Sequence, residues 1–174
     1  MILTDTGPIV ALADQSDPHR QQVERAFAQM QGPMTTTDAC VTEALCLLYR
    51  GGGWNSQDIL QRMFSADYLR IFPTSEADVL RALEYMKRFR DQPCDYADAT
   101  ILVAAEDSGR RSVFTLDKHF YAYRLTNGNS VEVLPYPPHI SRTTAALRDA
   151  GSACPLIVSR APGRPGGEFV NNAA

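Results

Sequence analysis

Short apolar runs alternate with helical patterns along most of this chain, and this alternation limits the possible folds more than any other feature. We expect five strands of three to five residues, at Ile2–Thr4, Met34–Thr36, Tyr68–Phe72, Ser112–Leu116 and Val131–Leu134. Helices between successive strands imply crossover connections, which join parallel strands and are almost always right-handed. The sequence therefore predicts an α/β fold, a three-layer α/β/α sandwich with a mainly parallel central sheet.

Capping residues and helix breakers indicate where the helices begin and end. Pro8 and Pro18 occupy first-turn positions, where the missing N–H of proline costs nothing. Ser75 with Asp78 resembles a capping box. The expected helices are one opened by Thr6-Gly7-Pro8, one capped by Asp17 with Val23, Ala26, Phe27 and Met30 on one face, Ala39–Arg50 capped by Asp38, Asn55 or Ser56 to Ser65, Glu76–Phe89, and Asp95–Ser108.

Composition separates a folded domain from a C-terminal tail. The 174 residues carry a net charge of −3 and suit one domain. Prolines and glycines become frequent near Pro135, so we expect a folded domain at 1–136 and a Pro/Gly-rich C-terminal tail at 137–174, partly disordered, with a short helix around Thr143–Ala150. The tail has four arginines against two acids, whereas residues 1–136 have 13 bases against 18 acids.

Targeting features indicate a cytoplasmic protein. No stretch approaches the roughly 20 apolar residues that cross a membrane, and the N-terminus lacks a basic leader. The four cysteines are scattered and form no Cys-x-x-Cys pair, which argues against a disulfide framework or a zinc site. We therefore expect no membrane contact.

Two aspartates directly follow expected strands. Asp5 follows the first strand and Asp117 the fourth. In open parallel sheets ligands bind beyond the carboxyl ends of the strands, so both acids would lie at one edge. Each could equally cap the helix that follows it, which is a common role. Their positions alone leave both interpretations open.

Three further acids stand in apolar surroundings. Glu43 is the one charged residue between Asp38 and Arg50, in a helix that should be largely buried. A buried carboxylate requires a partner or a metal, and the alternative is an exposed stripe along the helix edge. Asp95 and Asp98 share a face at the start of an apolar helix, where the alternative is a capping role favoured by the helix dipole.

Together these acids suit a hard divalent cation. Neighbouring carboxylates raise each other's pKa, and a divalent ion removes that penalty. Ligand sets made only of oxygen favour Mg²⁺ and Mn²⁺. The expected catalytic and metal-binding set is Asp5, Glu43, Asp98 and Asp117, with Asp95 as an additional metal candidate.

Four local motifs occur in order along the chain and carry a family resemblance. They are Asp5-Thr6 after a short strand, Glu43 in an apolar helix, Asp95-Tyr-Ala-Asp98-Ala, and Thr115-Leu-Asp117-Lys-His-Phe120 followed by Tyr123-Arg124. Together they resemble the PIN domain, and more narrowly the VapC-type toxin ribonucleases of type II toxin–antitoxin systems. The resemblance covers about residues 1–136 and leaves the tail unexplained.

The resemblance implies a ribonuclease that uses Mg²⁺ or Mn²⁺ at an acidic site. The four acids of the expected set match the family's acidic positions, and Thr6 and Thr115 match small hydroxyl positions beside the metal. Some members have another acid shortly after the fourth, where this chain reads Lys118-His119-Phe120, so the choice between one and two metal ions stays open. Family members are commonly homodimers neutralised by an antitoxin protein, and would contact DNA only through that antitoxin.

Phosphodiester chemistry suggests a role for each acid. A metal ion lowers the pKa of water and offsets phosphate charge, and the attack is in line. Asp5 and Asp98 would be direct ligands, Glu43 a ligand or the base that orients water, and Asp117 a ligand directly or through water. The products would carry a 5′-phosphate and a 3′-hydroxyl.

Substrate binding requires cations near these acids. The candidate phosphate contacts are Arg110, Arg111, Lys118 and Arg124, although each could be an ordinary surface charge. Trp54 could stack on a base or make an apolar contact with a partner or the core.

Three other functions fit parts of the sequence. One is a PIN nuclease of RNA processing that is not a toxin, and another is a non-catalytic PIN-like scaffold that binds RNA or protein. The third is a phosphatase or dehalogenase with an aspartate nucleophile. That interpretation is weakened because Asp5-Thr6-Gly7 lacks the second acid, two residues on, that many such phosphatases use.

Overall fold

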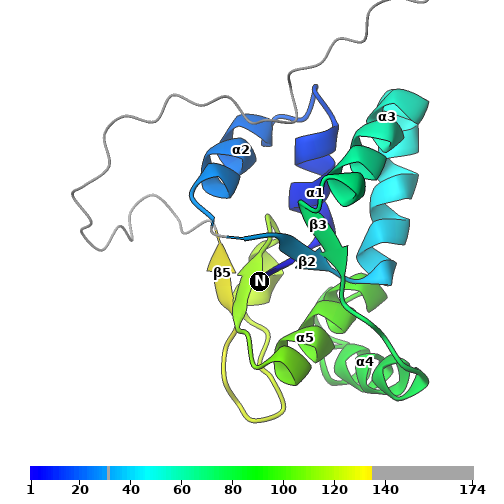
Figure 1. Ribbon diagram of the computed structural model, residues 1–174. Coiled ribbons are helices and arrows are strands. Elements are labelled where there is room, and N and C mark those ends of the chain that lie inside the picture. The colour runs from blue at the N-terminus through cyan, green and yellow to red at the C-terminus, as the bar shows by residue number, and fades with distance from the viewer. Residues whose placement is uncertain (31, 135–174) are drawn as a thin grey trace, which may run out of the picture.

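The computed structural model describes residues 1–30 and 32–134, which form one parallel sheet with helices on both faces (Figure 1). The strands lie in the order β3-β2-β1-β4-β5, and every pair is parallel. The predicted α/β fold is therefore confirmed. The elements are β1 Ile2–Thr4, α1 Thr6–Ala13, α2 Arg20–Ala28, β2 Met34–Thr36, α3 Asp38–Ser65, β3 Leu69–Ile71, α4 Glu76–Arg88, α5 Tyr96–Ser108, β4 Ser112–Phe114, the 3₁₀ turn η1 Lys118–Tyr121, and β5 Glu132–Leu134.

The two faces of the sheet bury different layers. Leu3 and Val113 are register partners and point into a core shared with α4 and α5. Met34 and Phe114 point the other way, into a core shared with α1, α2 and α3. This arrangement results from the alternation of side chains along a strand. Figure 1 shows α4 and α5 on one side of the sheet and α1 to α3 on the other.

Helix α3 departs from the sequence prediction at its start and agrees with it at the predicted glycine break. Thr37 is its N-cap and accepts from the Cys40 N–H, so Asp38 is the first helical residue and not the cap. The two helices expected on either side of Gly51–Gly53 are both present within α3, and they meet at a kink where Gly53 adopts the non-helical angles φ 61° and ψ −148°. A left-handed residue of this kind favours glycine.

The same helix is also less buried than predicted. Cys40, Ala44 and Leu48 form its buried stripe, packed towards α1 and α5. Leu45 and Tyr49 lie on the other side of the helix and are exposed, and no described residue covers them. The expectation that apolar residues all round would bury this helix is wrong for the single chain.

The start of α2 shifts by two residues from its expected position. Asp17 accepts a hydrogen bond from the His19 N–H at 2.7 Å, and the helix begins at Arg20. Asp17-Pro18 therefore forms the turn before α2. Val23 is buried on the inward face of α2, as predicted.

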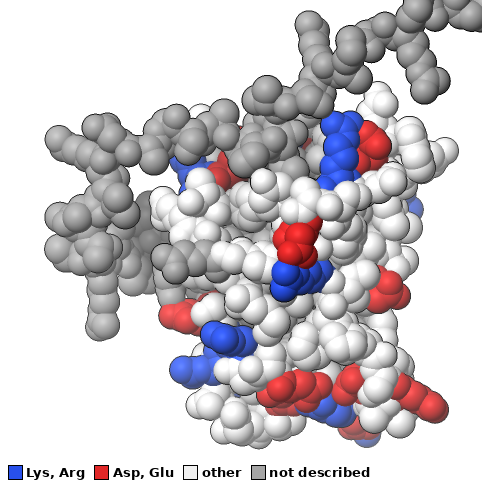
Figure 2. Space-filling view, in the orientation of Figure 1, with Lys and Arg blue, Asp and Glu red and all other residues white. Residues whose placement is uncertain are grey.

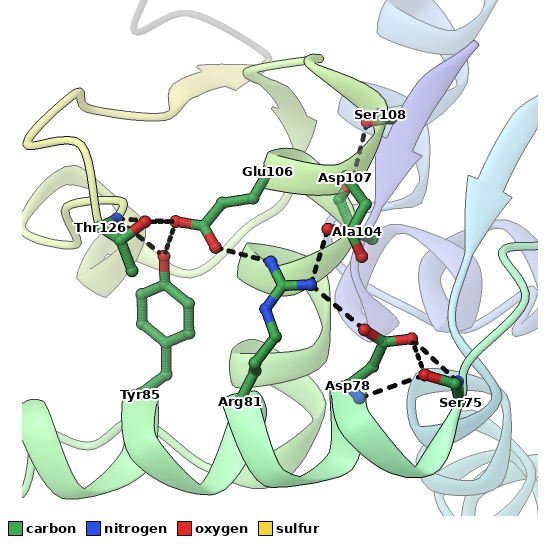
Figure 3. Close-up of polar contacts among 9 residues, drawn as sticks. All are labelled: Ser75, Asp78, Arg81, Tyr85, Ala104, Glu106, Asp107, Ser108 and Thr126. Carbon is green, nitrogen blue, oxygen red and sulfur yellow. Dashed lines mark hydrogen bonds and ion pairs between the residues drawn. The ribbon is translucent and has the colours of Figure 1, made fainter.

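Helices α4 and α5 are joined by a polar network centred on Arg81 (Figure 3). The Arg81 guanidinium lies 2.8 Å from a Glu106 oxygen and 2.6 Å from an Asp107 oxygen. Glu106 also accepts from the Tyr85 hydroxyl at 2.6 Å and from the Thr126 N–H at 2.7 Å. The network ties both helices to the loop before β5. The predicted capping box of Ser75 and Asp78 begins the same α4 helix.

Most of the face drawn in Figure 2 is uncharged, and acids and bases lie beside one another at several separate places on it, including its lower part near α4. Exposed ion pairs such as Arg62–Asp58 and Arg70–Asp67 contribute little to stability. Among residues 1–30 and 32–134, no helix is long and apolar enough to cross a membrane. The domain boundary at 136 and the helix around Thr143–Ala150 lie outside the described residues.

Candidate active site

The carboxyl edge of the sheet brings Asp5 and Asp117 together through one threonine hydroxyl. Thr115 follows β4, and its Oγ1 donates to Asp5 Oδ2 at 2.7 Å. The same oxygen accepts from the Asp117 N–H at 2.9 Å. Asp5 is the N-cap of α1 and Asp117 the N-cap of η1. The capping interpretation and the shared-edge interpretation therefore hold at once for both residues.

A second threonine links Asp5 to Glu43. The Thr6 N–H donates to Asp5 Oδ1 at 2.6 Å, and its Oγ1 donates to Glu43 Oε2 at 2.7 Å. Glu43 projects from α3 and is half-buried. Both oxygens of Asp5 are thus fixed by hydrogen bonds, each to a residue that also contacts another acid.

Asp98 faces the same edge from the first turn of α5. Asp95 caps this helix and accepts from the Asp98 N–H at 3.0 Å. Asp95 is exposed, whereas Asp98 is only 8% exposed. The one hydroxyl proton of the buried Tyr123 is shared between the Pro93 carbonyl, at 2.6 Å, and Asp98 Oδ2, at 3.2 Å. The side chain of Asp98 is therefore held from the loop that follows η1.

The pKa values of these acids show that their negative charge is poorly compensated. Burial raises the pKa of Asp5 to about 6, against the lowering effect of its two threonine hydrogen bonds, and the charges of Glu43 and Asp117 raise it further. Burial raises the pKa of Asp98 to about 8, and the neighbouring aspartates add to it. Repulsion reaching from one acid to the next means that the four lie near one another.

The donor set suits a hard divalent cation. All four side chains offer carboxylate oxygens, and a bound cation would offset the charge that raises the pKa of Asp5 and Asp98. Over the described ranges, however, no three His, Cys, Asp or Glu side chains are close enough to surround one ion. The chemistry of the residues, rather than their present spacing, therefore fits Mg²⁺ or Mn²⁺.

A groove of about 820 Å³ adjoins the acids, and we call it the acidic groove. It lies between the first turns of α3 and α5 and the chain that leaves β3. Three carboxylates line it, from Asp38, Glu43 and Asp95, beside apolar groups such as Phe72 and Tyr96. We call the four acids Asp5, Glu43, Asp98 and Asp117 the acid cluster. Glu43 lines the groove and also belongs to this cluster, so the groove adjoins the cluster directly.

The structure separates the cations that the sequence indicated as phosphate contacts. Arg110 and Arg111 precede β4, at the amino edge of the sheet, whereas Asp117 follows its carboxyl end. The structure thus does not bring these two arginines to the acids. Lys118 is exposed in η1, next to Asp117. Arg124 Nη1 donates to two main-chain carbonyls of its own loop, at 2.9 and 2.8 Å.

Two contacts at the site were not expected from the sequence. In the sequence Tyr123 is only part of a motif, and its contact with Asp98 depends on a loop path that spacing does not reveal. His119 Nδ1 lies 2.6 Å from Asp117 Oδ1. Its position two residues after Asp117 was a usable signal, because an Asx turn brings those residues together. Trp54 is 70% exposed, which excludes the core contact.

Similarity to known proteins extends over most of the described chain. The family model for the PIN domain matches residues 2–126. Ribonuclease VapC26 of Mycobacterium tuberculosis is 23% identical over 135 residues, which cover 77% of this chain and 100% of that protein. The crystal structure of M. tuberculosis VapC20, described as a sarcin-ricin loop cleaving toxin, superposes with a TM-score of 0.65 at 20% identity, covering 70% of this chain and 94% of VapC20.

These three matches favour a PIN domain over the aspartate-nucleophile phosphatase that the sequence left open. The matched PIN residues contain all four acids and both threonines described above. Since the family model covers well over half of the chain, this protein belongs to the PIN domain family, as a distant relative of the mycobacterial VapC ribonuclease toxins.

Proposed function

We propose that this protein is an endoribonuclease dependent on Mg²⁺ or Mn²⁺ and the toxin of a toxin–antitoxin pair. The observation that carries the proposal is the linkage of Asp5 to Glu43 and to Asp117 through two threonine hydroxyls, with Asp98 beside them. A purely structural cap would not require four acids with unrelieved mutual repulsion. Uncompensated buried charge is typical of functional sites.

Each acid has a role that fits its position. Asp5 and Asp98, the most buried of the four, would hold the cation. Glu43 is half-buried at the mouth of the groove, where it would accept a proton from water or orient it. Asp117 is fixed by His119 and Thr115 and would complete the set directly or through water. When bound, the cation lowers the pKa of water and offsets charge on the scissile phosphate.

RNA as substrate and an antitoxin as partner are supported by the names of the relatives. VapC26 is named a ribonuclease, and VapC20 is described as a toxin that cleaves the sarcin-ricin loop. Both similarities are below 25% identity, so the particular RNA is left to experiment. DNA would be reached only through the antitoxin.

A homodimer is supported by the exposed apolar side chains of α3 and α4. Tyr49 is 68% exposed and Leu80 60% exposed, with Leu45, Leu47 and Leu83 also accessible. Large exposed apolar groups of this kind mark interaction surfaces. We propose that these helices contact a second copy of the chain, and sedimentation of the purified protein measures this directly.

The proposal is tested by RNA cleavage with and without divalent metal. We expect cleavage in Mg²⁺ or Mn²⁺, loss with chelator, and loss in Asp5→Asn and Asp98→Asn. Cleavage that survives both substitutions would refute the site. Cleavage without growth arrest on expression would indicate an RNA-processing nuclease, and RNA binding without cleavage would indicate a scaffold.

A further inference from the structure

The acidic groove has the chemistry of a receptor for a basic chain segment. Its three carboxylates are joined by apolar side chains, and within the described residues no lysine or arginine lines it. A phosphate backbone alone would be repelled from such a lining, whereas a guanidinium would pair with it. Because Glu43 lines the groove, anything seated there lies against the acid cluster.

The described chain ends at the same edge of the sheet as the acids. β5 runs parallel to β4, and the Leu134 carbonyl accepts from the Thr115 N–H at 2.9 Å. Thr115 in turn donates to Asp5. Thr115 alone therefore links Leu134 to Asp5, and the segment that follows Leu134 in the sequence starts beside the acid cluster.

That segment, residues 135–174, has the complementary charge. It contains four arginines against one aspartate and one glutamate, whereas residues 1–134 are acidic. The PIN family match stops at residue 126, so this segment lies beyond the matched PIN residues. Its basic residues are Arg142, Arg148, Arg160 and Arg164.

The distance to the groove is within reach of these arginines. From β5 to β3 the sheet is about 19 Å wide, at ~4.8 Å per strand. Arg142 lies eight residues after Leu134, and eight residue steps span up to about 26 Å. Arg142 can therefore reach the groove, and the later arginines can do so more easily. Attachment in one chain gives an effective concentration in the millimolar range.

We propose that residues 135–174 are an intramolecular ligand of the acidic groove, with arginine side chains paired to Asp38, Glu43 and Asp95. Arginines paired there offset the charge of Glu43, which lines both the groove and the site of the proposed reaction, and so restrain RNA cleavage in cis. The effect on cleavage rests on the proposed nuclease function. Occupancy of the groove does not, so the two can be tested apart.

Hydrogen–deuterium exchange on the full chain tests occupancy. The variant R142Q/R148Q/R160Q/R164Q removes the positive charge of the segment and leaves the groove intact. Asp38→Asn removes one exposed groove carboxylate that belongs to no catalytic role. A matched control, R25Q/R90Q, removes exposed arginines elsewhere.

We expect the amides of residues 38–43, 71, 72, 74 and 95–97 to exchange at least threefold faster in the quadruple variant than in the unaltered chain. Asp38→Asn and high salt should act in the same direction, whereas the control and the amides of α2 should not change. The protection must be independent of protein concentration. Equal exchange in the groove overturns the proposal, and protection that grows with concentration overturns it in favour of a second copy as the occupant.

Cleavage supplies the second readout. With metal present, the quadruple variant should cut RNA at least threefold faster than the unaltered chain. Slower cutting with weaker RNA binding would show that the arginines recruit RNA, which overturns restraint in cis. A protein that cuts no RNA in any form refutes the proposed function, while the exchange result still decides whether the groove is occupied.

Discussion

Two groups of acids in this protein have opposite electrostatic surroundings. Between α4 and α5, burial would raise the pKa of Glu106, but hydrogen bonds from Thr126, Tyr85 and Arg81 lower it to about 2. At the carboxyl edge of the sheet, Asp98 has no cationic partner among the described residues, and its pKa is raised to about 8. The residue type is similar, and the difference lies in what each carboxylate contacts.

This difference separates structural acids from functional ones. The carboxylates of Glu106 and Asp107 are paired with Arg81 within the fold, so they contribute to stability and are not free to bind a ligand (Figure 3). The acids at the carboxyl edge of the sheet, which we call the edge acids, are the acid cluster. Neutral hydroxyl groups hold Asp5 and Glu43 in this cluster, and they orient the carboxylates without cancelling their charge. Their mutual repulsion destabilises the metal-free fold, and a bound cation would offset that repulsion.

Neutralising one acid in each group should give the largest contrast between them. Asp98→Asn should reduce metal-dependent RNA cleavage at least 100-fold, because it removes a cation ligand, while leaving the free energy of unfolding equal or higher. Glu106→Gln should leave cleavage per folded molecule within about threefold and lower stability instead. Cleavage and urea denaturation of both variants measure the four quantities. If Glu106→Gln abolished cleavage as well, the functional division between the groups would be wrong.

Removing the shared cation tests the structural group alone. Arg81→Met keeps much of the aliphatic stem and leaves Glu106 and Asp107 without their ion pairs. We expect a loss of about 1–3 kcal/mol in the free energy of unfolding, below the figure for fully buried pairs because Arg81 is 38% exposed. Lys87→Met on the same helix is the control, since its contact to Glu84 is long and exposed. Equal losses in both would assign the effect to helix α4 in general.

How far the sequence could predict these groups depends on the range of their contacts. Capping signals are local, so the start of α4 at Ser75 and the cap of α5 at Asp95 could be identified from a few residues. The edge acids were also within reach, because the topology of a parallel sheet places the residues after β1 and β4 together.

Contacts that depend on loop paths and packing partners could not be predicted. The contact of Tyr123 with Asp98 spans 25 residues and depends on the course of the loop after η1. The exposure of Leu45 and Tyr49 could not be foreseen either, because an apolar pattern does not show whether the surface that covers it belongs to the same chain. The amino-edge position of Arg110 results from the direction of β4, and closeness in sequence to Asp117 concealed it.

The pH dependence of stability distinguishes the two groups further, because they act in opposite directions. An acid whose pKa is raised in the folded state binds more protons there than in the unfolded chain, so stability falls as pH rises. For metal-free protein we expect the free energy of unfolding to fall by about 1–3 kcal/mol between pH 5 and pH 8, from Asp5 and Asp98. Asp98→Asn should flatten that slope in urea titrations.

Below pH 5 the pH dependence of stability comes mainly from the acids between α4 and α5. The pKa of Glu106 is lowered in the folded state, so its contribution is present above its unfolded value and is lost as pH falls towards 2. Glu106→Gln should remove that part of the acid limb and leave the slope between pH 5 and pH 8 unchanged. A chain whose stability rose steadily from pH 5 to pH 8 would contradict the raised pKa values.

The smallest effect concerns Tyr123, which connects the two groups in the chain. The Thr126 N–H binds Glu106 three residues after Tyr123, whose hydroxyl reaches Asp98. Tyr123→Phe keeps the buried ring and removes the hydroxyl, so Asp98 loses a partner that orients it. Hydrogen bonds to metal ligands support affinity, and we expect Mn²⁺ binding measured by calorimetry to weaken about 3- to 10-fold.

The control for that substitution is Tyr85→Phe, which removes the equivalent hydroxyl from Glu106. It should lower stability by about 1 kcal/mol and leave Mn²⁺ affinity unchanged. Equal loss of Mn²⁺ affinity in both variants would mean that the network between α4 and α5 positions Asp98 through the loop from 123 to 126. The structural group would then be part of the functional site, and the division drawn between the two sets of acids would have to be given up.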